Sequence, residues 1–215
     1  MFTPPPELAG QICYGGLDLA STTDIAALEL VFPIERVWPV LSFFWVPKEN
    51  AERRSKRDRV PYPLWIDQGF IEATDGNVID YDVIRRRVNE LGKTYQIKEL
   101  AVDRWNSLQL QTQLAGDGFT VCQFGQGFKD MSDPMKQLMG KVLERRICHF
   151  GNPVLRWMAS NVAAEQDAAG NFKPNKAKSS ERIDGIVALI MAIGRAMVAP
   201  EKKGSVYDTR GLFQF

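Results

Sequence analysis

Near its N-terminus the chain reads Gln11-Ile12-Cys13-Tyr14-Gly15-Gly16-Leu17-Asp18-Leu19, continues through Ser21-Thr22-Thr23-Asp24, and is apolar again over residues 25–32. Two apolar runs on either side of a polar, turn-forming cluster predict two antiparallel strands. Residues 37–46 are rich in Val, Phe and Trp and predict a third strand, which Pro47 ends. The first part of the chain is therefore predicted to be a three-stranded meander.

The rest of the chain alternates between helical and strand patterns. Short apolar runs predict strands over residues 97–102 and 119–124, with a helix between them, and this succession favours parallel pairing. A hairpin is predicted over residues 161–173, because the residues at its centre suit a tight turn. The charged residues 48–59 are predicted to form a solvated loop or a short helix. Apolar residues at helical spacing predict helices over residues 80–95, 107–114, 134–147 (led by Pro134) and 180–198.

Composition limits the class of protein. The 215 residues are 45% hydrophobic, which suits one domain with a sizeable core. Lys and Arg number 27 against 26 Asp and Glu, so the net charge of +1 indicates no charged partner by itself. Three cysteines without metal-ligand spacing and a single histidine, His149, argue against a zinc site and favour a reducing compartment, predicted to be a cytoplasm. The longest apolar run, residues 186–193, is too short to span a membrane.

Three aspartates stand at the ends of predicted buried elements. Asp18 interrupts the first strand, Asp103 ends a later strand, and Asp184 opens the last helix. An aspartate at such a position often only caps a chain, but desolvated carboxylates that converge repel each other unless a cation compensates. Carboxylates without His or Cys partners favour Mg²⁺ or Mn²⁺, and two such ions about 4 Å apart are a known means of phosphodiester hydrolysis. Asp24, across the turn from Asp18, could add a fourth carboxylate.

Five blocks of sequence together resemble the C-terminal nuclease half of the large terminase subunit of tailed double-stranded DNA bacteriophages. They occur in the family's order. The blocks are Gly16-Leu17-Asp18-Leu19-Ala20-Ser21-Thr22-Thr23-Asp24, Asp103-Arg104-Trp105-Asn106, Phe124-Gly125-Gln126-Gly127-Phe128, Gly151-Asn152-Pro153-Val154-Leu155-Arg156-Trp157-Met158-Ala159-Ser160-Asn161 and Glu181-Arg182-Ile183-Asp184-Gly185-Ile186-Val187-Ala188-Leu189.

The resemblance implies an α/β fold of RNase H-like type, a mixed β-sheet flanked by α-helices with an extra β-hairpin before the last helix. It also implies a metal-dependent endonuclease that cuts concatemeric phage DNA during genome packaging with two divalent cations, Mg²⁺ or Mn²⁺. The family's acidic residues fall on Asp18, Asp103 and Asp184, with the auxiliary one on Asp24. The hairpin is an element that the family places beside the DNA groove.

Full-length members of the family also carry a packaging ATPase. This sequence contains no GxxxxGK[ST] phosphate loop and is not expected to translocate DNA alone. The resemblance implies double-stranded DNA, the terminase ATPase domain, the small terminase subunit and the portal as partners, and no membrane. Within the chain, residues 1–10 are predicted to be a linker or flexible N-terminus, 11–199 the nuclease domain and 200–215 a loosely ordered tail.

DNA binding without sequence preference relies on phosphate contacts, so clustered basic residues are the candidates. One cluster precedes Asp184, and a second lies in residues 53–59. Arg104 and Asn106 flank Asp103, where they could orient DNA, and Gly125-Gln126-Gly127 is interpreted as a turn that approaches the site closely. The basic candidates are Lys173, Lys176, Lys178 and Arg182, together with Arg53, Arg54, Lys56, Arg57 and Arg59.

Three alternatives stay open. A Holliday-junction resolvase or a transposase-type nuclease could share the fold, and a preference for branched DNA would distinguish it. A sugar or acetate kinase relative would need a second glycine-rich hairpin and an adenosine loop, which the sequence lacks. A non-catalytic docking module for portal or capsid would be indifferent to divalent ions.

Overall fold

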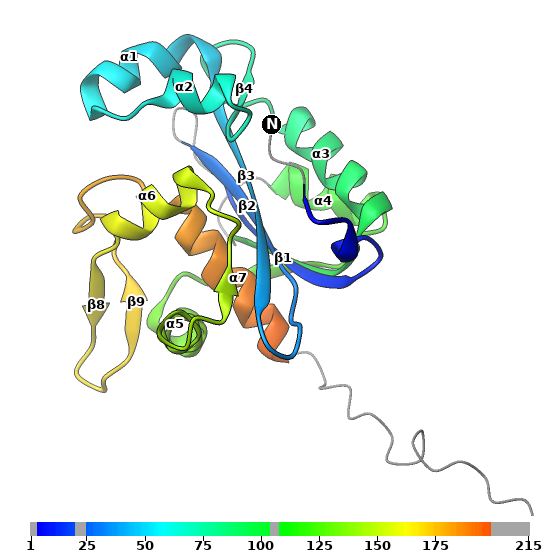
Figure 1. Cartoon of the computed structure of the whole chain (residues 1–215), viewed down its shortest axis with the longest axis vertical. Helices are drawn as coiled ribbons and strands as arrows, with labels where there is room; N and C mark the ends of the chain where they lie inside the picture. The colour runs from blue at the N-terminus through cyan, green and yellow to red at the C-terminus, as the bar shows by residue number, and fades with distance from the viewer. Residues whose placement is uncertain (1–3, 20–24, 104–107, 199–215) are drawn as a thin grey trace, which may run out of the picture.

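The computed structural model describes residues 4–19, 25–103 and 108–198. The candidate residues Asp24, Arg104 and Asn106 lie outside these ranges. The apolar runs of the sequence become strands and the periodic segments become helices. They assemble around one central sheet with helices on both faces (Figure 1).

The sheet has seven strands, with the order β4-β3-β2-β1-β5-β6 and a short β7 that pairs with the other end of β3. The predicted meander is confirmed, because β1, β2 and β3 pair antiparallel. The predicted parallel pairing is also confirmed, since β5 runs parallel to both β1 and β6. The bounds are Ile12–Asp18 (β1), Ala26–Val31 (β2), Trp38–Pro47 (β3), Glu72–Thr74 (β4), Gln96–Asp103 (β5), Val121–Phe124 (β6) and Ile147–Cys148 (β7).

Helices cover the two faces of the sheet and bury two apolar clusters. One face carries α5, α6 and α7, and the other carries α3 and α4, while α1 and α2 follow the end of β3 (Figure 1). The hairpin of β8 (Ala164–Gln166) and β9 (Phe172–Pro174) lies between α6 and α7 in the chain. The helices are α1 (Lys48–Asp58), α2 (Tyr62–Asp67), α3 (Tyr81–Thr94), α4 (Leu108–Gly116), α5 (Phe128–Leu143), α6 (Pro153–Asn161) and α7 (Asp184–Val198), with a short 3₁₀ turn at Pro6–Leu8 (η1).

Helix α7 packs directly on the central strand β1. Its residues 184–194 are all buried, as its nearly continuous apolar sequence predicts. Gly16 allows this close approach, because a Cβ there would collide with the Ala188 carbonyl. The alternation of β1 places Gly16 and Asp18 toward α7, while Cys13 and Leu17 face the opposite cluster.

The prediction for the helix over residues 134–147 was wrong at both ends. Helix α5 begins six residues earlier, so that Pro134 lies inside it, and it ends at Leu143. The apolar face that contacts the core starts with Met131 and continues through Met135 and Leu138, whereas Leu143 is 82% exposed. Arg145, just beyond the helix, adopts a left-handed conformation, and the chain then turns into β7.

The charged residues 48–59, predicted to form a loop or a short helix, form the helix α1. Several other short elements, α2, β4, β7 and α6, had no prediction of their own. Helix α2 is held against α6 by aromatic contacts, with Trp157 packed on Tyr62 and Trp65 at centroid distances of 6.0 and 5.6 Å. The hairpin was predicted at its observed place, with strands that end one residue later than expected.

Candidate active site

Two of the candidate aspartates lie side by side at one edge of the sheet. Leu17 pairs with Val102 on the parallel strands β1 and β5, and Asp18 and Asp103 follow that pair as the last residues of their strands. Both aspartates share a face with residues that contact α7, since Gly16 and Ala101 precede them by two positions. Asp18 is 1% exposed and Asp103 is 9% exposed, so both carboxylates are largely withdrawn from water.

The third aspartate reaches the same edge through the packing of α7 on β1. Gly16 lies against Ala188, and Asp184 is one helical turn before Ala188. One turn advances about 6 Å, and the two residues from Gly16 to Asp18 advance about 6–7 Å along the strand. Asp184 is therefore level with Asp18, and it is 6% exposed. Its position in the first turn also places its charge at the favourable end of the helix dipole.

A lysine joins Asp18 and Asp184. The Lys176 ammonium lies 2.7 Å from Asp18 Oδ2 and 3.0 Å from Asp184 Oδ1. Burial on its own would lower the pKa of Lys176, but attraction to both carboxylates and the hydrogen bonds to them outweigh it and raise the pKa. Lys176, which was predicted to bind DNA, is thus bonded to two of the predicted metal ligands.

The loop between β6 and α5 supplies a site residue that sequence reasoning missed. Gln126 Nε2 donates a hydrogen bond of 3.2 Å to Asp18 Oδ1, so both oxygens of that carboxylate have partners. The segment Gly125-Gln126-Gly127 was interpreted only as a turn that approaches the site. The glycines on both sides of a polar amide were the available signal for a side chain that reaches inward.

Glu29 is a second acidic residue that the sequence analysis did not single out. It lies on β2 opposite Gly16 and is fully buried. Ser42 on β3 donates a hydrogen bond of 2.6 Å to Glu29 Oε2, while Oε1 has no hydrogen-bond partner among the described residues. Burial raises the pKa of Glu29 well above its usual range, and the bond from Ser42 only partly opposes that shift. Glu29 thus lies near Gly185 at the start of α7, where burial favours its protonated form.

The donor set suits a hard cation. Aspartate oxygens are the ligands that Mg²⁺ and Mn²⁺ prefer, and the ammonium of Lys176 demonstrates that Asp18 and Asp184 can hold positive charge between them. Within residues 4–19, 25–103 and 108–198, no three His, Cys, Asp or Glu side chains are close enough together to hold a metal ion as they stand. Asp18 and Asp184 are arranged around the Lys176 ammonium.

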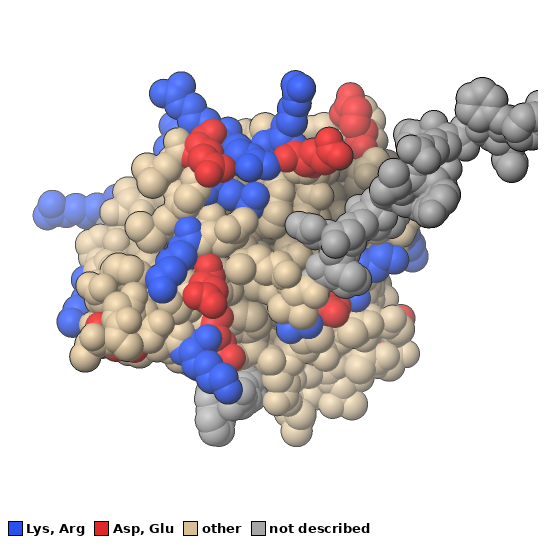
Figure 2. Space-filling model, turned by 90° about the horizontal axis from the view of Figure 1, so that it is seen from below, with Lys and Arg blue, Asp and Glu red and all other residues tan. Residues whose placement is uncertain are grey.

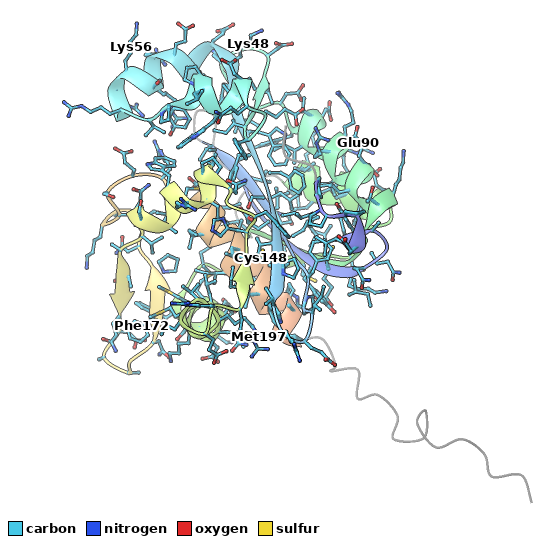
Figure 3. The ribbon with its side chains drawn as sticks, viewed as in Figure 1. Lys48, Lys56, Glu90, Cys148, Phe172 and Met197 are labelled. Carbon is cyan, nitrogen blue, oxygen red and sulfur yellow. The ribbon has the colours of Figure 1, made fainter. Side chains whose placement is uncertain are left out.

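The predicted basic residues are divided between two regions. Lys178 is exposed beside Lys176, and Lys173 on β9 lies with its ammonium 5.0 Å from the centroid of the Phe128 ring. The exposed residues Arg53, Lys56, Arg57 and Arg59 belong to α1 and its end. Figure 3 places Lys56 on α1 at one end of the molecule and Met197, near the end of α7, at the other.

One predicted DNA contact needs correction. Arg54 is only 4% exposed, and its guanidinium lies 5.9 Å from the ring centroid of Tyr62. The side chain points into the junction of α1 and α2 because the two helices pack there, which the charge run of the sequence did not reveal. Arg54 therefore has a packing role, which replaces the predicted phosphate contact. Arg182, the last of the candidates, is half-buried just before α7.

Comparison with known proteins places this arrangement in a family. The family model for the endonuclease domain of the terminase large subunit matches residues 1–200. The chain belongs to this family. The terminase endonuclease domain is 36% identical over 198 residues to the terminase large subunit of Enterobacteria phage HK97, covering 91% of this chain and 39% of that protein. The chain thus spans about two fifths of the length of this relative.

Solved structures agree with the terminase endonuclease assignment. The crystal structure of the HK97 large terminase has a TM-score of 0.80 at 36% identity, covering 88% of this chain and 42% of that one. The large terminase nuclease of thermophilic phage G20c with bound magnesium has a TM-score of 0.56 at 11% identity, covering 86% of this chain and 81% of that one. That nuclease has also been solved with bound cobalt. The RNase H-like fold predicted from the sequence is confirmed, and no helix in the described part of the chain is long and apolar enough to cross a membrane.

Proposed function

We propose that this terminase endonuclease domain is a divalent-metal-dependent DNA endonuclease with Asp18, Asp103 and Asp184 as its metal ligands. The observation that carries the proposal is the cation already held at the site, the Lys176 ammonium between two carboxylates that are 2% and 8% exposed. Buried carboxylates converge in this way when the site is built to hold positive charge.

The protein's own groups have distinct tasks in this proposal. Asp18, Asp103 and Asp184 would hold two cations, Mg²⁺ or Mn²⁺, with Asp24 as an additional ligand beyond the described residues. When bound, such ions activate water and stabilise the leaving oxygen of a phosphodiester. Gln126 fixes one oxygen of Asp18 through its hydrogen bond and thereby orients the carboxylate. The magnesium and cobalt complexes of the G20c nuclease support the choice of a divalent cation.

Phosphate contacts would come from basic residues around this edge of the sheet. Lys178 and Lys173 belong to the segment that contains the hairpin, whose strand β9 is fastened to α5 by a hydrogen bond of 3.2 Å from the Phe172 N–H to Ser132 Oγ. We propose that Lys173, Lys176, Lys178 and Arg182 contact the DNA near the site, that Arg53 on α1 contacts it further away, and that Arg104 and Asn106 orient the strand beside Asp103.

The biological substrate would be concatemeric double-stranded phage DNA, cut during genome packaging in the host cytoplasm. The partners would be the terminase ATPase domain, the small terminase subunit and the portal. Residues 11–199 would form the nuclease domain, preceded by a linker over residues 1–10 and followed by a tail over 200–215. The identity to the HK97 terminase supports this assignment.

Cleavage of supercoiled plasmid in Mn²⁺, Mg²⁺ or EDTA tests the proposal. We expect cutting that requires the metal and that falls more than about 100-fold in Asp18→Asn, Asp103→Asn and Asp184→Asn, because even residues that only orient metal ligands contribute about 10–100-fold. The control is Asp133→Asn, since Asp133 is exposed on α5.

Other outcomes distinguish the alternatives. Strong preference for a four-way junction over plasmid would indicate a resolvase. Retained cutting in all three aspartate variants would reject the site. Failure to cut, combined with no thermal stabilisation by Mn²⁺, would favour a docking module, because a ligand that binds only the folded state must stabilise it.

A further inference from the structure

Lys176 places its charge and its stem in different environments. Its side chain is 47% exposed, yet its ammonium contacts carboxylates of Asp18 and Asp184 that are 2% and 8% exposed. The stem therefore extends along the surface and only its tip enters the acidic site. A lysine held by its tip alone can leave by rotation about its own side-chain bonds, because its stem is flexible.

The backbone that carries Lys176 is fastened to the hairpin. The Asn175 N–H donates to the Ala163 carbonyl at 2.9 Å, and the Asn175 side-chain amide donates to Glu165 Oε2 at 2.6 Å. Ser179 Oγ donates to the Asn175 carbonyl at 2.7 Å. These bonds fix the position from which the lysine reaches the site, so the ammonium can move while the hairpin stays in place.

The contact of Lys176 with Asp18 and Asp184 offsets the electrostatic repulsion between the two carboxylates. Asp18 and Asp184 are desolvated and share a neighbourhood, so their charges repel unless a cation lies between them. In the protein without metal that cation is Lys176. A divalent cation held by Asp18 and Asp184 would compete with the Lys176 ammonium for these two carboxylates.

We propose that Lys176 is an exchangeable counter-cation, which holds the acidic site in the metal-free protein and must be displaced by the first divalent cation. This inference rests on the proposed function, because it assigns Asp18 and Asp184 to the metal. Lys176 keeps the site assembled before metal arrives, and it lowers the apparent affinity for metal. After displacement its ammonium remains within one lysine side-chain length of the site, where a DNA phosphate would meet it.

The test is a calorimetric titration of Mn²⁺ into the metal-free 215-residue chain and into matched variants. Lys176→Met removes the competing charge, Lys176→Arg keeps it, and Lys178→Met removes a neighbouring exposed charge that has no bond to the aspartates in the structure. If Lys176 occupies the site about nine-tenths of the time, its removal tightens Mn²⁺ binding about tenfold. We expect Lys176→Arg and Lys178→Met to bind within about threefold of the wild type, because neither frees the carboxylates.

Thermal unfolding gives a second readout that does not depend on activity. In EDTA, Lys176→Met is expected to melt below both the wild type and Lys178→Met, because two buried carboxylates lose their cation. With saturating Mn²⁺ this deficit is expected to disappear, since the metal replaces the missing charge. Lys176→Gln is measured alongside it as a polar replacement of similar length, in case the methionine variant does not fold.

Failure of this inference can be separated from failure of the proposed function. If the Met and Gln variants bind Mn²⁺ no more tightly than the wild type, while Asp184→Asn abolishes binding, the exchange is wrong and the metal site stands. If Lys176→Arg tightened Mn²⁺ binding as much as Lys176→Met does, the proposed exchange would also be overturned. The arginine keeps the positive charge, so loss of that charge could not explain the tighter binding. Absence of Mn²⁺ binding in the wild type and in every Lys176 variant would overturn both.

Discussion

Two acidic side chains on the same face of the sheet illustrate how a residue's partners decide its state. Asp18 is buried, but it accepts hydrogen bonds from Lys176 and Gln126, so both of its carboxylate oxygens have partners. Glu29 on the next strand has only the Ser42 hydroxyl, and burial raises its pKa well above the usual range. The first residue suits cation binding, whereas burial of the second favours its protonated form.

The raised pKa of Glu29 predicts a pH-dependent difference in stability between the wild type and Glu29→Gln. Above the unfolded-state pKa of about 4.3, the unfolded wild type loses a proton that the folded protein retains, so its stability falls as pH rises toward the folded pKa. Gln has no proton to lose. The free energy of unfolding of the variant minus that of the wild type should therefore increase with pH, by up to about 1.4 kcal/mol per pH unit.

Urea unfolding of both proteins at several pH values between about 4 and 8 measures this difference. Groups other than residue 29 cancel in the comparison. A difference that stays constant over the whole range would contradict the raised pKa of Glu29.

The close packing of Gly16 against α7 predicts that no larger side chain is tolerated at this position. Gly16→Ala should destabilise the protein by roughly 3 kcal/mol, because the new methyl group would meet the Ala188 carbonyl and the backbone of α7 would have to shift. Gly140→Ala is the control, since a Cβ at that helical position meets nothing within 4 Å. Its expected effect is a gain of about 0.5–1 kcal/mol. Chemical denaturation measures both, and equal effects would contradict the packing of α7 on β1.

At the scale of elements, α5 shows how a periodic pattern can be assigned to the wrong stretch. Met135, Leu138, Met139, Val142 and Leu143 form a continuous helical stripe in the sequence, but only Met135 and Leu138 of these are buried. The stripe is as apolar as a core face, so the sequence alone does not tell where the contact with α7 ends. The exposed part of it borders a groove that α6 and α7 also line.

The end of the buried face on α5 predicts that alanine substitutions at two of its leucines change stability by very different amounts. Leu138→Ala should cost about 3 kcal/mol of stability, because it leaves a cavity against the core. Leu143→Ala should change stability by less than about 0.5 kcal/mol, because that side chain is 82% exposed. Denaturant midpoints of the two variants measure the contrast. Similar losses at both positions would mean that the helix buries the face originally predicted.

At the scale of the whole molecule, charge is distributed without an extended basic patch on the face seen in Figure 2, where basic and acidic side chains are interspersed. The net charge of +1 agrees with this distribution. If the domain binds DNA as proposed, that binding would then depend on a few local cations rather than on the overall field.

A salt titration of DNA binding in EDTA tests which cations matter. The double variant Lys173→Gln with Lys178→Gln should reduce the slope of log K against log salt by about 2, because each lost phosphate contact contributes about 0.9. The matched control removes Lys93 and Lys98, which lie toward the opposite end of the sheet, at the end of α3 and the start of β5. A larger change in the control would place the DNA on another face.

Local periodicity and capping residues were enough to predict the main strands, the meander, the parallel strands β5 and β6, the amphipathic α3 and the buried α7. The sequence also pointed to Asp18, Asp103 and Asp184, since a carboxylate at the end of an apolar run is conspicuous. Four features became visible only in the folded protein: Lys176 bonds to two of these aspartates, Gln126 reaches Asp18, Glu29 is buried with a raised pKa, and Arg54 packs on Tyr62. These contacts join residues far apart in the chain, and the desolvation that gives them their strength exists only once β1, the hairpin segment and α7 have come together.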